Sequence, residues 1–177
     1  MGVLSGYRII ELSGIGPGPL CGMLFADLGA EVIRIDRKKT TLPNSKPKYD
    51  ITGRNKKSLS LNLKNAESLN VFNKLIKNAD ALIEGFRPGV TEKLGVGPDE
   101  CMKINPKLVY GRITGWGQTG TLSKVAGHDI NYIALAGALH SIGTIEKPTV
   151  PLNLIGDYGG GTMFLAFGVC AALLSAS

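Results

Sequence analysis

The chain has 177 residues, 44% of them hydrophobic and 19% charged, which is typical of one folded domain and excludes an intrinsically disordered chain. The formal net charge is +6, and ten of the twenty Lys and Arg residues lie between Arg34 and Lys64. Such a basic segment is most often a solvated loop, but it can also bind a phosphorylated ligand. We expect no nucleic-acid partner, because Tyr49 alone interleaves with these charges as an aromatic residue and no nucleic-acid-binding motif occurs.

Strand-like and helix-like segments alternate along residues 7–113. Apolar and β-branched runs predict strands, and apolar residues at helical spacing predict helices between them. This alternation is typical of an α/β domain with a Rossmann-like, mainly parallel sheet and flanking helices. The predicted strands are 7–12, 32–35, 58–63, 79–83 and 108–113, and the predicted helices are 20–28, 66–77, 89–94 and 98–104.

A glycine- and proline-rich turn follows the first predicted strand. Its glycines, Gly14, Gly16 and Gly18, are spaced G-x-G-x-G, whereas dinucleotide-binding turns have G-x-G-x-x-G. Pro17 and Pro19 lack the amide donors that would hold a pyrophosphate, so we do not expect this turn to bind NAD. Pro19 suits the first position of the helix that follows.

The pattern changes after Trp116, where two segments are apolar on most faces. Residues 129–139 and 162–174 are predicted to form helices, and such helices must be buried against other protein. The second has too few apolar residues to span a bilayer, so we expect no membrane span. The sequence ends at this helix without a cap or a terminal loop, and we therefore expect the chain to be part of a longer protein.

The cysteines and the N-terminus bear on the compartment. Cys21, Cys101 and Cys170 are odd in number and widely spaced, with no C-x-x-C or His/Cys cluster, so we expect neither a disulfide framework nor a metal site. Residues 1–8 lack a charged region followed by an apolar stretch, and we expect no signal peptide. These features predict an intracellular protein.

One of the two histidines lies in the segment Gly127-His128-Asp129-Ile130-Asn131-Tyr132, beside a carboxylate and after a glycine-rich turn. A second carboxylate, Asp157, precedes Gly159-Gly160-Gly161 and the last predicted helix. Taken alone, either acid could simply cap a helix. Together, a histidine and a distant carboxylate suggest proton transfer. His140, at the end of an apolar helix and without a motif, is interpreted as structural.

These residues agree with one known family. The sequence resembles the class III CoA-transferase family, the CaiB/BaiF group, and the matches run in the same order along the whole chain. His128 favours the racemase branch of that family, because the transferases lack this histidine. The matching segments are E-L-S-G-I-G-P-G-P at 11–19, 27–37, E-G-F-R-P-G-V at 84–90, T-G-W-G-Q-T-G at 114–120, 127–132 and 151–161.

The resemblance implies that residues 1–177 form the N-terminal CoA-binding domain of a longer enzyme that is an interlocked homodimer. It implies a cofactor-independent 1,1-proton transfer at the α-carbon of 2-methylacyl-CoA thioesters, with CoA as part of the substrate. His128 would handle the proton of the S substrate, and Asp157 that of the R substrate. A supporting glutamate would lie in the second half. The compartment would be the cytoplasm in a bacterium, and mitochondria or peroxisomes in a eukaryote.

Two acid–base groups suit this chemistry. The α-proton of a thioester is weakly acidic, and racemisation removes it from one face and returns a proton on the other. An imidazole titrates near neutral pH, whereas a carboxylate needs its pKa raised by burial to act as the acid. We also expect backbone amides at Gly159-Gly160-Gly161, next to a helix N-terminus, to stabilise the enolate oxygen.

The family match also suggests CoA contacts. Arg37 suits adenine stacking or the 3′-phosphate, and Arg87 suits pairing with a phosphate. The backbone of Leu61-Asn62-Leu63-Lys64 would border the nucleotide, whereas Lys56 and Lys57 are interpreted as solvated bystanders. Asn62 and Phe86 replace an aspartate and a tyrosine of relatives.

The segment around His128 completes this candidate binding set with Gly127, Asp129, Ile130, Asn131 and Tyr132. Asp129 either orients the histidine ring or caps a helix through a backbone hydrogen bond. Tyr132 either lines the thioester pocket or packs in the core.

Two alternatives stay open. In a CoA-transferase, Asp157 would be a nucleophile that forms an acyl anhydride. His128 argues against this reaction, which needs no second base. The chain could also be a CoA-binding fragment without activity of its own.

Overall fold

A five-stranded parallel sheet forms the centre of the molecule in the computed structural model, which describes residues 2–37 and 50–176. The strand order is β3-β2-β1-β4-β5, and every neighbouring pair is parallel. This is the order of a Rossmann-like sheet, so the predicted fold class is confirmed. The strands are β1 (Arg8–Leu12), β2 (Glu31–Asp36), β3 (Lys57–Ser60), β4 (Ala81–Glu84) and β5 (Val109–Arg112).

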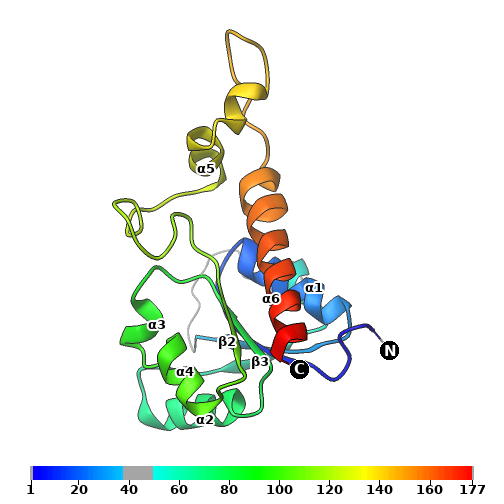
Figure 1. The fold of residues 1–177 in the computed structure, drawn as a ribbon, viewed down its shortest axis with the longest axis vertical. Helices are drawn as coiled ribbons and strands as arrows, with labels where there is room; N and C mark the ends of the chain where they lie inside the picture. Colours follow the sequence, from blue (N-terminus) through cyan, green and yellow to red (C-terminus); the bar gives the residue numbers. More distant parts are fainter. Residues whose placement is uncertain (1, 38–49, 177) are drawn as a thin grey trace.

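Helices cover both faces of this sheet (Figure 1), which explains why consecutive residues of β1 and β4 are buried without alternation. On one face, Phe72 packs against Ile10 and Leu82 of the sheet. On the other face, Phe25 and Val169 belong to a second core cluster. The first face carries α2 (Ala66–Ile76), α3 (Val90–Lys93) and α4 (Pro98–Ile104), and the second carries α1 (Pro17–Asp27) and α6 (Met163–Ala176).

The turn before α1 differs slightly from the prediction. The helix begins at Pro17 rather than at Pro19, and Gly16 precedes it with a φ of 73° that favours glycine. The predicted end is confirmed, because Gly29 has a φ of 97° and its amide donates to the carbonyl of Ala26. Residues 13–16 therefore connect the carboxyl end of β1 directly to the start of α1.

Strand β3 ends three residues earlier than predicted. The Leu61 amide still donates to the carbonyl of Asp36 in β2, at 2.9 Å. The Asn62 side chain then accepts a hydrogen bond from the Lys64 amide, which folds the chain into a turn. The side chain of Asn65 caps α2 by accepting from the Glu67 amide at 2.8 Å.

The last helix is longer than predicted, because a π-helix, η4 (Leu154–Thr162), leads directly into α6. A Cβ at Gly159 would lie 2.8 Å from the carbonyl oxygen of Leu154, and one at Gly160 would lie 3.0 Å from that of Ile155. Glycine tolerates these close contacts, since it has no Cβ. Asp157 thus lies inside the helix, and the prediction that the glycine triplet precedes a helix N-terminus is wrong.

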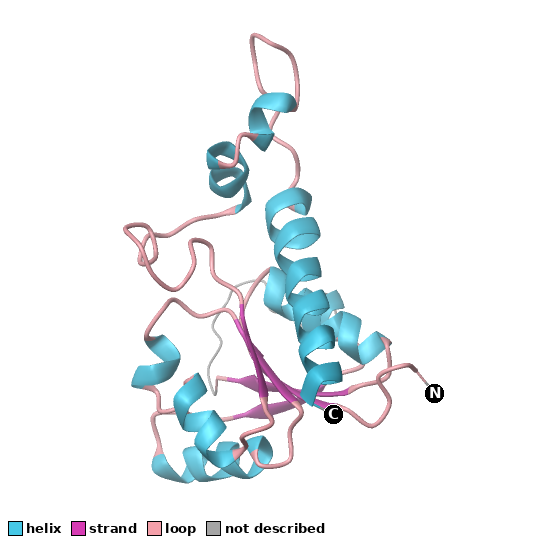
Figure 2. Cartoon of the chain, in the orientation of Figure 1, coloured by secondary structure: helices cyan, strands magenta, loops and turns pink. Residues whose placement is uncertain are grey.

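The region between β5 and η4 extends away from the sheet (Figure 2). The predicted helix 129–139 is two shorter pieces, α5 (Asp129–Leu135) and a 3-10 turn, η3 (Ala138–Ser141). Gly137 separates them with a φ of 83°. This region places α5 beside η4 at one end of the sheet.

The combined helix Leu154–Ala176 has 23 residues and contains an 18-residue window with a mean hydropathy of 1.6, so by length and composition it could cross a membrane. The predicted helix 162–174 has too few apolar residues for a span, whereas the observed helix begins eight residues earlier and ends two residues later. The core helix of a larger protein meets the same criteria, and 22% of the apolar window is buried within the described chain.

Candidate active site

A cavity of about 690 Å³ opens where β1, β4 and β5 end. Ligands of open parallel sheets bind at the carboxyl ends of the strands, and this volume is in the usual range of about 300–1,000 Å³ for small-molecule sites. The turns after the three strands line the cavity with residues 15–17, 85–88 and 113–116. Its other wall comes from some of the residues between 123 and 161, including Gly127, His128, Tyr132, Asn153 and Asp157.

His128 is held at the start of α5. Its backbone amide donates to Oδ1 of Asn131 at 2.9 Å, which ties the first turn of the helix together. The residue is exposed and lines the cavity. An imidazole in this position can exchange protons with a bound molecule and with solvent.

Asp157 lines the same cavity from η4 and is half-buried. Burial raises the pKa of its carboxyl, and the negative charge of Asp129 raises it further. A hydrogen bond from the Asn153 side chain and the charge of His128 oppose this increase in pKa. The carboxyl is therefore a better proton carrier near neutral pH than a free aspartate.

Two aromatic rings form part of the wall beside His128. Trp116 and Tyr132 meet edge to face, with ring centroids 4.9 Å apart. A Cβ at Gly127 would lie 2.7 Å from Cε1 of Tyr132, and one at Gly115 would lie 2.2 Å from its hydroxyl. Both glycines are thus required for the ring to pack here. Trp116 has no predicted role, although the glycines on either side of it indicate close packing.

Of the residues predicted to form the site, His128, Asp157, Gly127, Tyr132 and Arg87 line one cavity. Arg37 lies next to it, because its guanidinium is 5.8 Å from the ring centroid of Phe86, which lines the cavity.

The other predicted residues lie outside the lining of the described cavity. Residues 61–64 form the turn after β3, where Leu61 is buried in the core. Ile130 and Asn131 are exposed on α5. Asp129 is buried, and its Oδ2 accepts a hydrogen bond of 2.7 Å from the Asp157 amide. Asp129 thus contacts the site through the backbone of Asp157.

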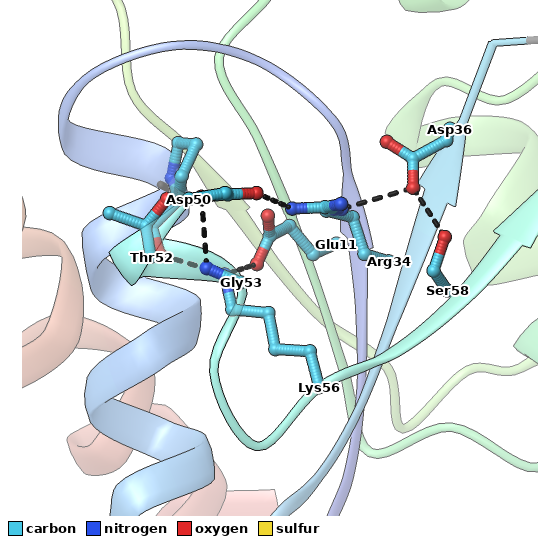
Figure 3. A network of polar contacts seen from close by, with 9 residues as sticks. Glu11, Arg34, Asp36, Asp50, Thr52, Gly53, Lys56 and Ser58 are labelled. Carbon is cyan, nitrogen blue, oxygen red and sulfur yellow. Dashed lines mark hydrogen bonds and ion pairs between the residues drawn. The ribbon is translucent and has the colours of Figure 1, made fainter. Parts of the chain in front are cut away.

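Four basic residues in the described part of the basic segment form ion pairs within the protein, namely Arg34, Arg54, Lys56 and Lys57. Arg34 donates to the carboxylates of Asp36 and Asp50, so these groups already satisfy its charge (Figure 3). Lys57 is exposed and pairs with Glu31. The residues at 38–49, including four lysines, lie outside the described residues. A phosphate site in this segment therefore depends on residues other than Arg34.

Lys56 is not the solvated bystander that its sequence context suggested. Its side chain is 1% exposed, and Nζ donates to Oε2 of Glu11 at 2.6 Å and to the carbonyl of Pro19 at 2.8 Å (Figure 3). Burial raises the pKa of Glu11 to about 7, although Lys56 opposes the increase. The pair joins β1 to α1 and to the start of β3.

No cluster of three or more His, Cys, Asp or Glu side chains in residues 2–37 and 50–176 could hold a metal ion. The side chains that line the cavity include acid–base, aromatic and guanidinium groups.

Known proteins match the chain along almost its whole length. α-Methylacyl-CoA racemase of Mus musculus is 48% identical over 97% of this chain and 44% of the relative, and that of Homo sapiens is 47% identical over 96% and 44%. The crystal structure of Rv3272 from Mycobacterium tuberculosis is 35% identical, with a TM-score of 0.86, over 98% of this chain and 49% of that one. The chain spans about half the length of the relatives it matches. With residues 4–177 matching CoA-transferase family III as well, the chain belongs to that family of enzymes.

Proposed function

We propose that the protein containing this chain racemises 2-methylacyl-CoA thioesters by 1,1-proton transfer at the α-carbon. The observation that carries the proposal is that His128 and Asp157 line one cavity from two different elements, α5 and η4. The identity of 47–48% to two α-methylacyl-CoA racemases supports it.

In this mechanism, His128 and Asp157 act on opposite faces of the α-carbon. One group removes the α-proton to give an enolate, and the other, in its protonated form, returns a proton on the opposite face. The raised pKa of Asp157 supports its role as the acid, because a larger fraction of the carboxyl is protonated near neutral pH. We assign the proton of the S substrate to His128 and that of the R substrate to Asp157.

The substrate would supply CoA itself, and no further cofactor is needed for this proton transfer. We propose that Arg37 and Arg87 bind the nucleotide part, since Arg87 lines the cavity and Arg37 stacks on Phe86 beside it. The turn 61–64 would border the nucleotide through its backbone. We also propose the interlocked homodimer, which would cover exposed apolar side chains such as Phe164 and Phe167.

A CoA-transferase is the second candidate, with Asp157 as a nucleophile that forms an acyl anhydride. The relative named probable fatty acyl-CoA transferase Rv3272, which is 35% identical, favours this candidate. His128 in the same cavity favours the racemase, because the transfer reaction requires no second base.

Deuterium incorporation distinguishes the two reactions. The full-length protein that contains this chain is incubated in D₂O with (R)- or (S)-2-methylacyl-CoA and without an acceptor acid, and α-deuterium is followed by NMR. Racemisation gives exchange together with inversion. Acyl transfer to an added carboxylic acid without any exchange would refute the racemase. We expect the 177 residues alone to show little or no turnover, and robust turnover by them would contradict that expectation.

A further inference from the structure

Asp129 lies directly behind the two proposed acid–base groups. It occupies the first turn of α5, next to His128, and is 5% exposed. Its Oδ2 accepts a hydrogen bond of 2.7 Å from the backbone amide of Asp157, 28 residues later in the chain. One buried carboxylate thus joins the element that carries His128 to the element that carries Asp157.

The local structure makes room for this contact. Asp157 is the fourth residue of η4, so its amide belongs to the first turn, where amides have no partner within the helix. A carboxylate acceptor there forms a charge-assisted hydrogen bond. A Cβ at Gly156 would lie 3.2 Å from both Cγ and Oδ2 of Asp129, so a larger residue would push against the carboxylate.

We infer that Asp129 is a positioning residue for the proposed proton transfer: its carboxylate holds the backbone of Asp157 and thereby fixes the spacing between the Asp157 carboxyl and the His128 ring. The inference rests on the proposed function. Both groups must reach the same α-carbon, and a displacement of about 1 Å can lower a rate about 100-fold. Among the described residues, Asp129 and His128 are the charged groups that act on the carboxyl of Asp157, and the charge of Asp157 in turn acts on Tyr132.

Two substitutions separate the hydrogen bond from the charge. Asp129→Asn keeps an oxygen acceptor of the same length and removes the charge, whereas Asp129→Ala removes both. Asp99→Ala is the matched control, because Asp99 is an exposed carboxylate in the first turn of α4. The first measurement is amide hydrogen exchange by NMR in the ¹⁵N-labelled chain of 177 residues. We expect the Asp157 amide to exchange about tenfold or more faster in Asp129→Ala, as the loss of a charged hydrogen bond predicts. Asp129→Asn should change it less, and Asp99→Ala should not change it.

The second measurement is the pH dependence of racemisation by the full-length protein. We expect Asp129→Ala to lower kcat about 100-fold with KM nearly unchanged. Asp129→Asn should retain most of kcat. The limb of its pH–rate profile that reports the titration of Asp157 should move to lower pH, because the negative charge of Asp129 is gone. If Asp129 only stabilised the fold, the substitutions would lower the midpoint of unfolding, and the two variants would not differ in kcat and in pH profile in this way.

The inference fails if Asp129→Ala leaves Asp157 amide exchange or kcat unchanged, or if both variants lose kcat equally. If Asp129→Ala does not fold, an unshifted pH profile in Asp129→Asn overturns it. Should the wild-type protein not exchange α-protons, the proposed function fails. Faster amide exchange in Asp129→Ala would then show a structural contact, and the positioning role would be wrong.

Discussion

Removing the cation from the buried Glu11–Lys56 pair should strongly destabilise the fold. Both side chains are 1% exposed, and Oε1 of Glu11 has no hydrogen-bond partner among the described residues. Lys56 is therefore the main group that compensates the negative charge of the buried Glu11 carboxylate (Figure 3). Lys56→Met keeps the length of the side chain and removes its charge.

The size of the effect follows from burial and from the pKa of Glu11. Breaking a buried ion pair by removing one partner costs about 3–5 kcal/mol, out of a total stability of about 5–15 kcal/mol. The folded pKa of Glu11 is about 7, above its ordinary value of 4.5, so the folded state binds this proton more tightly. The contribution of this carboxyl to stability is thus greatest below pH 4.5 and is lost, by about 3 kcal/mol, as pH rises to 7.

Lys56→Met raises the folded pKa of Glu11 further, because the opposing charge is gone. We therefore expect the unfolding free energy to decrease by the full amount of about 3–5 kcal/mol at pH 8. The decrease should be much smaller at pH 5, where folded Glu11 is protonated. Urea unfolding followed by circular dichroism measures both. Lys57→Met is the matched control, since Lys57 is 71% exposed and its ion pair contributes about 1 kcal/mol or less.

The double variant Glu11→Gln, Lys56→Met tests the origin of the loss. It should recover much of the stability at pH 8, because no charge remains buried. Equal decreases in unfolding free energy for Lys56→Met and Lys57→Met at pH 8 would refute the role of the buried pair. A decrease for Lys56→Met that does not depend on pH would also refute it.

Two further predictions concern the cavity. In the full-length protein, His128→Ala should lower α-proton exchange of the S substrate about 100-fold or more, and Asp157→Asn should do so for the R substrate, as deuterium NMR would show. Exchange of both substrates at wild-type rates in His128→Ala would remove the histidine from the mechanism. Gly127→Ala places a Cβ 2.7 Å from the Tyr132 ring, so it should destabilise the chain by about 1–3 kcal/mol and shift the fluorescence of Trp116, the single tryptophan. An unchanged spectrum and stability would show that the ring is not confined there.

The sheet could be predicted from the sequence because its central strands are buried on both faces. The short runs at residues 9–10 and 81–83 are apolar in consecutive positions, which local patterns detect. Gly29 marked the end of α1 through its backbone conformation, which is also a local property. The end of β3 was harder to predict from the sequence, because a side-chain hydrogen bond of Asn62 favours a turn over continuation of the strand.

The paired and positioned groups required the tertiary structure. The sequence does not distinguish Lys56 from the other lysines of the basic segment, because its partner Glu11 lies 45 residues earlier. A glutamate inside an apolar strand was the available signal, because a buried carboxylate needs a partner. The contact of Asp129 with the Asp157 amide spans 28 residues and depends on η4, whose wide turn no apolar periodicity indicates. His128 and Asp157 were found as residue types in motifs, whereas their shared cavity comes from the fold.

The packing of helix α6 on the sheet argues against its insertion into a bilayer. One face already packs on the sheet, where Val169 and Leu173 are 3% and 4% exposed. At its start, Thr162 donates to the carbonyl of Pro17 and ties the helix to α1. Insertion into a bilayer would separate this face from the sheet and expose the second core cluster to water, which costs about 25 cal/mol per Å² of apolar surface. Since the sheet holds one face of the helix, its remaining apolar side chains, including Phe164 and Phe167, require only a protein surface to cover them.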